Sequence, residues 1–176
     1  SVIRLDCNGR VLLLDRPRIM GIVNVTPDSF SDGGRFHGSS AEAIAHCEQL
    51  ARDGADILDI GGESTRPGIA PVALEEERAR VLPVLRAALE LGVPVSVDTY
   101  KPELMREVLD LGADIVNDVW GLRRPGALQA VAAHPNCGVC IMHMHGEPQT
   151  MQIASVLVMY SAIARSCGIG SNGLPR

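Results

Sequence analysis

Apolar residues in this sequence gather in short uninterrupted runs, which are separated by longer amphipathic segments. A continuous apolar run of roughly four to eight residues is typical of a strand buried on both faces, as in a parallel sheet. We therefore predict strands over 19–25, 57–60 and 93–97, a fourth that begins at 115–116, and a fifth over 139–142.

The segments between these runs predict helices. Residues 41–53 carry apolar side chains at three- and four-residue spacings, with Ser40 as the expected N-terminal cap. A second helix is expected over 74–91, and Pro102 and Pro125 are expected to open a third and a fourth in their first turns. The first three helices are expected to end at Gly54, Gly92 and Gly112. This regular alternation predicts parallel βα units, which form either a barrel or a doubly wound sheet.

The N-terminal segment has a different pattern, which predicts a β-hairpin over residues 2–15. Two short apolar runs, 2–5 and 11–14, flank the pair Asn8 and Gly9. Asn-Gly is the residue pair that a tight two-residue hairpin turn favours.

Composition narrows the class of protein. A net charge of -5 and an aromatic content of 3% argue against nucleic-acid binding, which relies on basic surfaces and stacking side chains. No apolar stretch approaches the length of about 18 residues that a membrane span needs, and charged residues occupy the N-terminal segment in place of a signal sequence. The five cysteines are irregularly spaced, which favours reduced thiols. We expect a cytoplasmic protein that binds neither nucleic acid nor membranes.

Polar side chains follow the predicted strands. Because active sites of parallel α/β proteins lie at the C-terminal ends of the strands, we expect these side chains to share one mouth. The series comprises Asn24, Asp59, Glu63, Thr65, Asp98, Asn117, Asp118, His143 and His145. Helix capping could explain any one of them. As a set, they suit a small polar heterocycle, because carboxylates and amides pair with adjacent N–H and C=O groups.

Two loops add to this mouth. Residues 24–34 (NVTPDSFSDGG) are longer and richer in glycine than a minimal connection requires, and residues 61–68 read GGESTRPG. The second loop offers backbone N–H groups, two hydroxyls and the guanidinium of Arg66, which suits an anion or a negatively charged leaving group. Two flexible surface loops are the alternative.

A metal site at Cys137 and Cys140 is considered and set aside. Their C-x₂-C spacing, followed by His143 and His145, is typical of zinc or redox sites. However, a strand is predicted over 139–142, and a second cysteine pair is missing.

Five motifs, in this order, resemble the bacterial dihydropteroate synthase family. They are GIVNVTPDSFSDGG (21–34), DIGGESTRPG (59–68), VSVDTYKP (95–102), IVNDVWG (115–121) and MHMHGEPQTMQ (142–152). The resemblance covers residues 1–152 and implies a TIM (β/α)₈ barrel. It also implies a transferase of folate biosynthesis, the target of sulfonamides, and a family that is usually homodimeric. This enzyme condenses 6-hydroxymethyl-7,8-dihydropterin diphosphate with p-aminobenzoate, giving 7,8-dihydropteroate and diphosphate.

The resemblance also implies roles for individual residues. Asn24 and Asp28 would hold the Mg²⁺ that binds the diphosphate, and Thr65 would contact the diphosphate and the aminobenzoate region. Asp98 and Arg66 would be catalytic, since a carboxylate favours the cationic pterin ring and a guanidinium stabilises the leaving diphosphate. Asn117 would bind the pterin together with Asp98. The aminobenzoate pocket would be shaped by Phe30, Ser64, Arg66 and Pro67.

The chain departs from the family after Gln152. A complete (β/α)₈ barrel needs about 250 residues, whereas this chain has 176, and residues 153–176 are expected to be a divergent or out-of-frame tail. We expect only the first five βα units, with two unpaired strand edges. A truncated, catalytically inactive fragment with at most weak pterin binding is therefore the alternative to the active enzyme.

Overall fold

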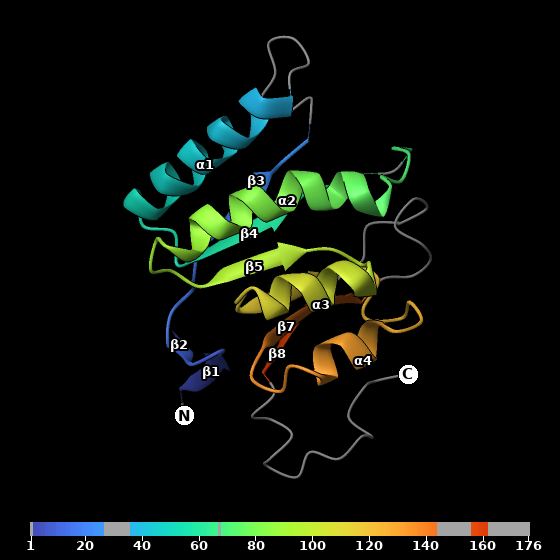
Figure 1. Ribbon diagram of the computed structural model, residues 1–176. Coiled ribbons are helices and arrows are strands. Elements are labelled where there is room, and N and C mark those ends of the chain that lie inside the picture. Colours follow the sequence, from blue (N-terminus) through green and yellow to red (C-terminus); the bar gives the residue numbers. More distant parts are fainter. Residues whose placement is uncertain (1, 27–35, 67, 144–155, 162–176) are drawn as a thin grey trace.

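The structure, a computed structural model, describes residues 2–26, 36–66, 68–143 and 156–161 (Figure 1). Strands and helices alternate along most of this length, as predicted. The strands are β1 (Ile3–Cys7), β2 (Arg10–Leu14), β3 (Met20–Asn24), β4 (Ile57–Gly61), β5 (Val95–Asp98), β6 (Ile115–Asp118), β7 (Gly138–His143) and β8 (Val156–Ser161). The helices are α1 (Phe36–Arg52), α2 (Leu74–Leu89), α3 (Pro102–Asp110) and α4 (Ala127–Ala132).

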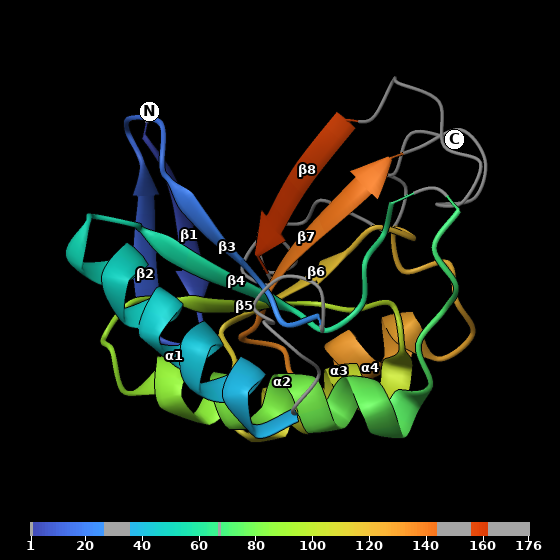
Figure 2. The same ribbon diagram turned by 90° about the horizontal axis from the view of Figure 1, so that it is seen from above.

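Strands β3 to β8 form one sheet in sequence order. The pairs from β3 to β7 are parallel, and β8 joins β7 in the antiparallel direction. Figure 2 shows α1 to α4 on one face of this sheet, while the β1–β2 hairpin lies toward the other face. Within the described part of the chain, none of the helices has the length and apolarity to cross a membrane.

Strand β8 was not predicted, and it replaces β7 as one edge of the sheet. Within the described residues, the order β3 to β8 still leaves two edge strands, as expected. Strand β8 lies within residues 153–176 and pairs with β7 from Val156↔His143 to Ser161↔Gly138. The apolar run of this segment supplies a strand that satisfies the backbone groups along the β7 edge.

Two helix starts differ from the prediction. Helix α1 begins at Phe36, so Ser40 lies inside it and is not its cap. Serine is only mildly unfavourable in a helix, and the helix therefore continues through it. Helix α4 begins at Ala127 and not at Pro125, because Gly126 adopts a left-handed conformation (φ 89°) that a helix cannot include.

The core lies between the helices and the outer face of the sheet. Side chains alternate along each strand, so Leu58 and Ile60 of β4 and Val95 and Val97 of β5 face the helices and are fully buried. Burial of this apolar layer supplies the main favourable free energy of the fold. It also directs the intervening residues, among them Asp59 and Ser96, to the inner face.

The hairpin packs on the inner face, near the strand starts. As predicted, Asn8 and Gly9 form its turn, both with positive φ (55° and 81°). Leu5, Cys7 and Leu12 form a second apolar cluster with strand residues Ile57, Ile115 and Cys140. The hairpin therefore closes the N-terminal side of the sheet and leaves the opposite side for the predicted mouth.

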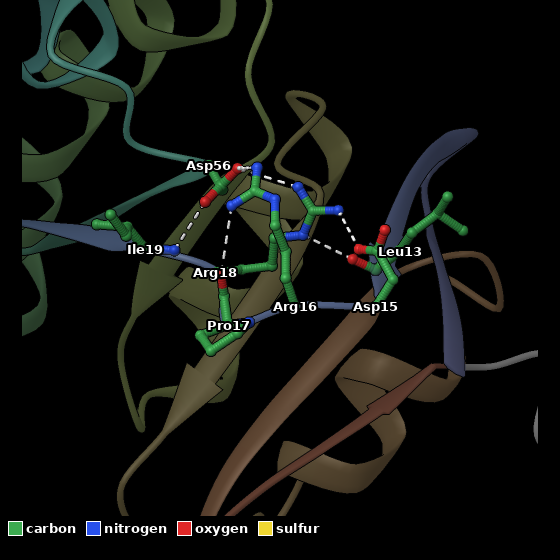
Figure 3. A network of polar contacts seen from close by, with 7 residues as sticks. All are labelled: Leu13, Asp15, Arg16, Pro17, Arg18, Ile19 and Asp56. Carbon is green, nitrogen blue, oxygen red and sulfur yellow. Dashed lines mark hydrogen bonds and ion pairs between the residues drawn. The ribbon is translucent and has the colours of Figure 1, made fainter. Parts of the chain in front are cut away.

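An ionic network ties the hairpin to the sheet (Figure 3). Asp56 accepts a hydrogen bond from the backbone N–H of Ile19 at 2.8 Å and pairs with Arg18 and Arg16 at 3.3 and 3.4 Å. Arg18 also donates to the carbonyl of Leu13 at 2.6 Å. The backbone hydrogen bond from Ile19 is the main cause of the lowered pKa of Asp56. This network fixes the hairpin against the beginning of β4.

Candidate active site

One row of paired residues crosses the inner face of the sheet near the C-terminal strand ends. Asn24 pairs with Gly61, Gly61 with Asp98, Asp98 with Asn117, and Asn117 with Cys140. Paired residues of neighbouring strands point to the same face. The structure therefore brings Asn24, Asp98 and Asn117 together from three different strands.

Gly61 keeps the middle of this row open. A Cβ atom at this position would lie 3.7 Å from Oδ2 of Asp98 and 3.8 Å from Oδ1 of Asn24. The two side chains thus converge over the glycine, and a larger residue would occupy the space between them. The row therefore places an amide and a carboxylate within reach of the same point on the inner face.

A buried polar layer supports the row from below. Asp59 is 3% exposed, and its Oδ1 accepts a hydrogen bond from Ser96 Oγ at 2.7 Å. Its Oδ2 accepts a hydrogen bond from Asn117 Nδ2 at 3.3 Å. Asp59 therefore holds one N–H of the Asn117 amide and leaves the amide oxygen for another partner.

The two carboxylates of this site resist ionisation. Burial raises the pKa of Asp98 well above its ordinary value, and the negative charges of Asp59 and Asp118 raise it further. Burial also raises the pKa of Asp59, although the hydrogen bonds from Ser96 and Asn117 oppose this effect. A ligand that brings positive charge or several N–H donors would relieve the repulsion between the carboxylates. The inner face is thus suited to a nitrogen heterocycle.

The loop after β4 follows Gly61, a member of this row, and carries the second group of predicted site residues. Ser64 and Thr65 are partly buried, Arg66 is exposed, and the Arg66 N–H donates to Ser64 Oγ at 3.4 Å. Asp28, Phe30 and Pro67, also predicted for the site, lie outside the described residues. His145 and the side chain of His143 lie outside them as well.

Two acidic residues expected at the mouth have other roles. Asp118 accepts hydrogen bonds from the backbone N–H groups of Trp120 and Leu122, both at 2.8 Å, so it caps the turn after β6. Glu63 binds Tyr100 and Lys101. Both residues thus have partners within the protein, although neither caps a helix.

Cys137 and Cys140 are buried free thiols in the part of the chain that the structure describes. No group of three or more histidine, cysteine, aspartate or glutamate side chains gathers around a common point in the described part of the chain. Burial, together with the charges of Asp59 and Asp98, raises the pKa of Cys140 to about 12. Because His145 and the side chain of His143 lie outside the described residues, setting the zinc site aside stays a prediction.

Sequence reasoning missed Ser96, Tyr100 and Lys101. Ser96 had a usable signal, because it is the polar residue that alternates with valines in VSVD and so shares a face with Asp98. Tyr100 and Lys101 had none, since their contacts depend on how the loop after β4 folds back.

Comparison with known proteins identifies the family. Residues 20–167 match the family described as pterin binding enzyme. The chain belongs to this family. A dihydropteroate synthase of Neisseria meningitidis serogroup B (strain ATCC BAA-335 / MC58) is 55% identical over 141 residues, which cover 80% of this chain and 50% of that relative.

Solved structures agree. Xanthomonas albilineans dihydropteroate synthase with 4-aminobenzoic acid matches with a TM-score of 0.78 and 57% identity, over 83% of this chain and 53% of the other. The same enzyme in complex with 7,8-dihydropteroate matches with a TM-score of 0.72 and 54% identity, over 81% and 52% of the two chains. The chain therefore has the α/β fold of these barrels and spans about half the length of the relatives it matches. The family match extends beyond residue 152, and the predicted boundary there stays a prediction.

Proposed function

We propose that this chain acts in folate biosynthesis as a dihydropteroate synthase. In this reaction the amine nitrogen of p-aminobenzoate forms a bond to the exocyclic methylene carbon of the dihydropterin. The carbon–oxygen bond to the diphosphate breaks, the diphosphate leaves with the electron pair, and the amine loses a proton. The observation that carries the proposal is the row in which Asn24, Asp98 and Asn117 share one face of the sheet, with Asn24 and Asp98 meeting over Gly61.

Asp98 and Asn117 are proposed to bind the pterin. The ring presents adjacent N–H and C=O groups, which a carboxylate and an amide match. Asp59 restricts the Asn117 amide by the hydrogen bond at 3.3 Å. As the leaving group departs, positive charge develops on the pterin, and a carboxylate in a buried site stabilises that charge more strongly than water does. Asp98 is therefore assigned an electrostatic role in addition to binding.

Asn24 is proposed to hold the Mg²⁺ that accompanies the diphosphate, together with Asp28. The exposed amide of Asn24 fits this role, because Mg²⁺ in phosphate sites takes few protein oxygens and completes its shell with water and phosphate. When bound, the ion would neutralise charge on the leaving diphosphate. Thr65 and Arg66 lie on the loop after the neighbouring strand β4 and are assigned the diphosphate oxygens.

The same loop is proposed to shape the p-aminobenzoate pocket. Ser64 and Arg66 would line it with Phe30 and Pro67, and a sulfonamide would compete there as an analogue of p-aminobenzoate. The amine is already a nucleophile, so this pocket mainly has to hold it in line with the methylene carbon.

The test is to incubate the purified chain with dihydropterin diphosphate, p-aminobenzoate and Mg²⁺ and to detect dihydropteroate by mass spectrometry. The proposal predicts product with the wild-type chain and a loss of at least about a hundredfold with Asp98→Asn, the order seen when one electrostatic stabiliser is removed. Pterin binding without product would favour the inactive-fragment alternative. The absence of both pterin binding and product would contradict the proposed function.

A further inference from the structure

Lys101 is the single lysine of the sequence and sits in an acidic surrounding. Its side chain is 12% exposed, and Nζ lies 2.7 Å from Oε2 of Glu63. It also makes a short contact with Oε2 of Glu77 on α2, and Nζ lies 4.7 Å from the ring centroid of Tyr100. The ammonium thus joins three segments: the loop after β4, helix α2 and the connection between β5 and α3.

Glu63 is the loop residue at the centre of these contacts. Its Oε1 accepts a hydrogen bond from the Tyr100 hydroxyl at 2.6 Å, while Oε2 accepts from Lys101 and from the backbone N–H of Val72 at 3.1 Å. One side chain near the start of the loop thereby holds the backbone nine residues later. The loop is closed upon itself at this carboxylate.

A second cation secures the beginning of the same loop. Arg80 of α2 donates to the carbonyl of Gly62 at 2.8 Å. Gly62 packs tightly on that helix, because a Cβ there would lie 2.9 Å from Val81 and 3.2 Å from the Glu77 carbonyl. The base of the loop is therefore fixed independently, and Lys101 acts on the part beyond it.

We propose that Lys101 is a positioning residue that, through Glu63, fixes segment 62–72 and with it Ser64, Thr65 and Arg66. This inference rests on the proposed function for what those three residues bind, whereas the clamp itself rests on the contacts alone. Lys101 follows Asp98 by three residues and precedes α3, so the connection directly after the strand that carries the pterin carboxylate carries the clamp. The pterin side and the diphosphate side of the site are thereby held at a fixed separation.

The chemistry of lysine suits this position. A compact ammonium offers three donors in different directions, so it can bind Glu63 and Glu77 at once within a confined space. The contacts of Lys101 with Glu63 and Glu77 are partly shielded from water. Removing the ammonium would leave the two carboxylates facing each other. Glu63 would then turn toward solvent, and the Val72 N–H would lose its partner.

Hydrogen exchange measured by mass spectrometry tests the clamp without any ligand. We expect Lys101→Met and Glu63→Gln each to speed exchange of amides in 62–72 on the order of tenfold, the effect of losing a charge-assisted hydrogen bond. The double variant should be no faster than either single one, because both remove the same interaction. Glu77→Gln is the matched control, since it removes the other ion pair of Lys101 but should change exchange in 62–72 less than threefold.

Affinity measurements test the consequence for the site. Lys101→Met should weaken binding of p-aminobenzoate and of Mg²⁺-diphosphate on the order of tenfold and change pterin binding less than twofold. Unchanged exchange in 62–72 for both Lys101→Met and Glu63→Gln, or additive effects in the double variant, would overturn the clamp. If the wild-type chain binds none of these ligands, the proposed function fails, while the exchange result still decides the clamp.

Discussion

Asn117 donates a hydrogen bond to Asp59 across an intervening strand. The two residues lie on β6 and β4, their side chains meet at 3.3 Å, and Ser96 of β5 donates to the other oxygen of Asp59. The inner face of three consecutive strands is thus joined by one carboxylate. Through it, the residue beneath the site determines how the Asn117 amide is presented to a ligand.

Asp59→Ala should weaken pterin binding five- to tenfold, because the Asn117 amide would lose the hydrogen bond that orients it. Ser96→Ala is the control, since it leaves the contact between Asp59 and Asn117 in place and should cost less than threefold. Isothermal titration with a dihydropterin measures both. Equal losses in the two variants would contradict an orienting role for Asp59.

Asp98→Asn should stabilise the protein at neutral pH while weakening its function. Burial raises the pKa of this carboxyl in the folded state, so the folded protein binds more protons than the unfolded one at pH values above the ordinary pKa of 3.8. The stability that this group contributes is present below that value and is lost as pH rises through the raised pKa. The asparagine amide does not ionise, so the Asp98→Asn protein does not lose this stability as the pH rises.

Urea unfolding from pH 4 to 8 measures this effect. We expect Asp98→Asn to gain on the order of 1 kcal/mol over the wild type at pH 8, within the range for substitutions that relieve an unfavourable functional site, and to gain less at pH 4. The lowered pKa of Asp56 acts in the opposite direction, since its contribution is lost only as pH falls below 3.8. A wild type and variant that differ equally at every pH would refute the account of Asp98.

Gly138→Ala should destabilise the fold by about 1–3 kcal/mol, the usual cost of overpacking. An added Cβ would lie 2.8 Å from Sγ of Cys7 and 3.1 Å from Ile115, where the hairpin packs on β7. Cys7→Ala removes the nearer atom. Gly138→Ala should therefore destabilise the Cys7→Ala protein less than it destabilises the wild type. Strictly additive effects in chemical denaturation would mean that the hairpin does not pack there.

The sequence predicts the parallel strands and the polar row because both follow from local patterns. Buried strands read as apolar runs, and the residue that ends each run must lie at one edge of the sheet, as Asn24, Asp98 and Asn117 do. Helix starts are less certain, because Ser40 fits both a cap and a helix interior. The sequence predicts Glu63 and Asp118 at the mouth, because the hydrophobic pattern shows where an acidic residue lies along the chain but not which group it binds. Their partners come from backbone N–H groups and side chains whose positions only the folded loop defines.

The central claim is that Asp98 and its neighbours on the inner face form a pterin site, and a matched pair of substitutions tests it most directly. Asp98→Asn changes the proposed ligand contact, while Asp114→Asn changes another buried acid of raised pKa, which binds the Val95 N–H near the strand starts.

Isothermal titration with a dihydropterin should show binding by the wild-type chain, a loss of at least about tenfold in Asp98→Asn, and a change below twofold in Asp114→Asn. Equal affinity in all three proteins, or no binding by the wild type, would contradict the claim.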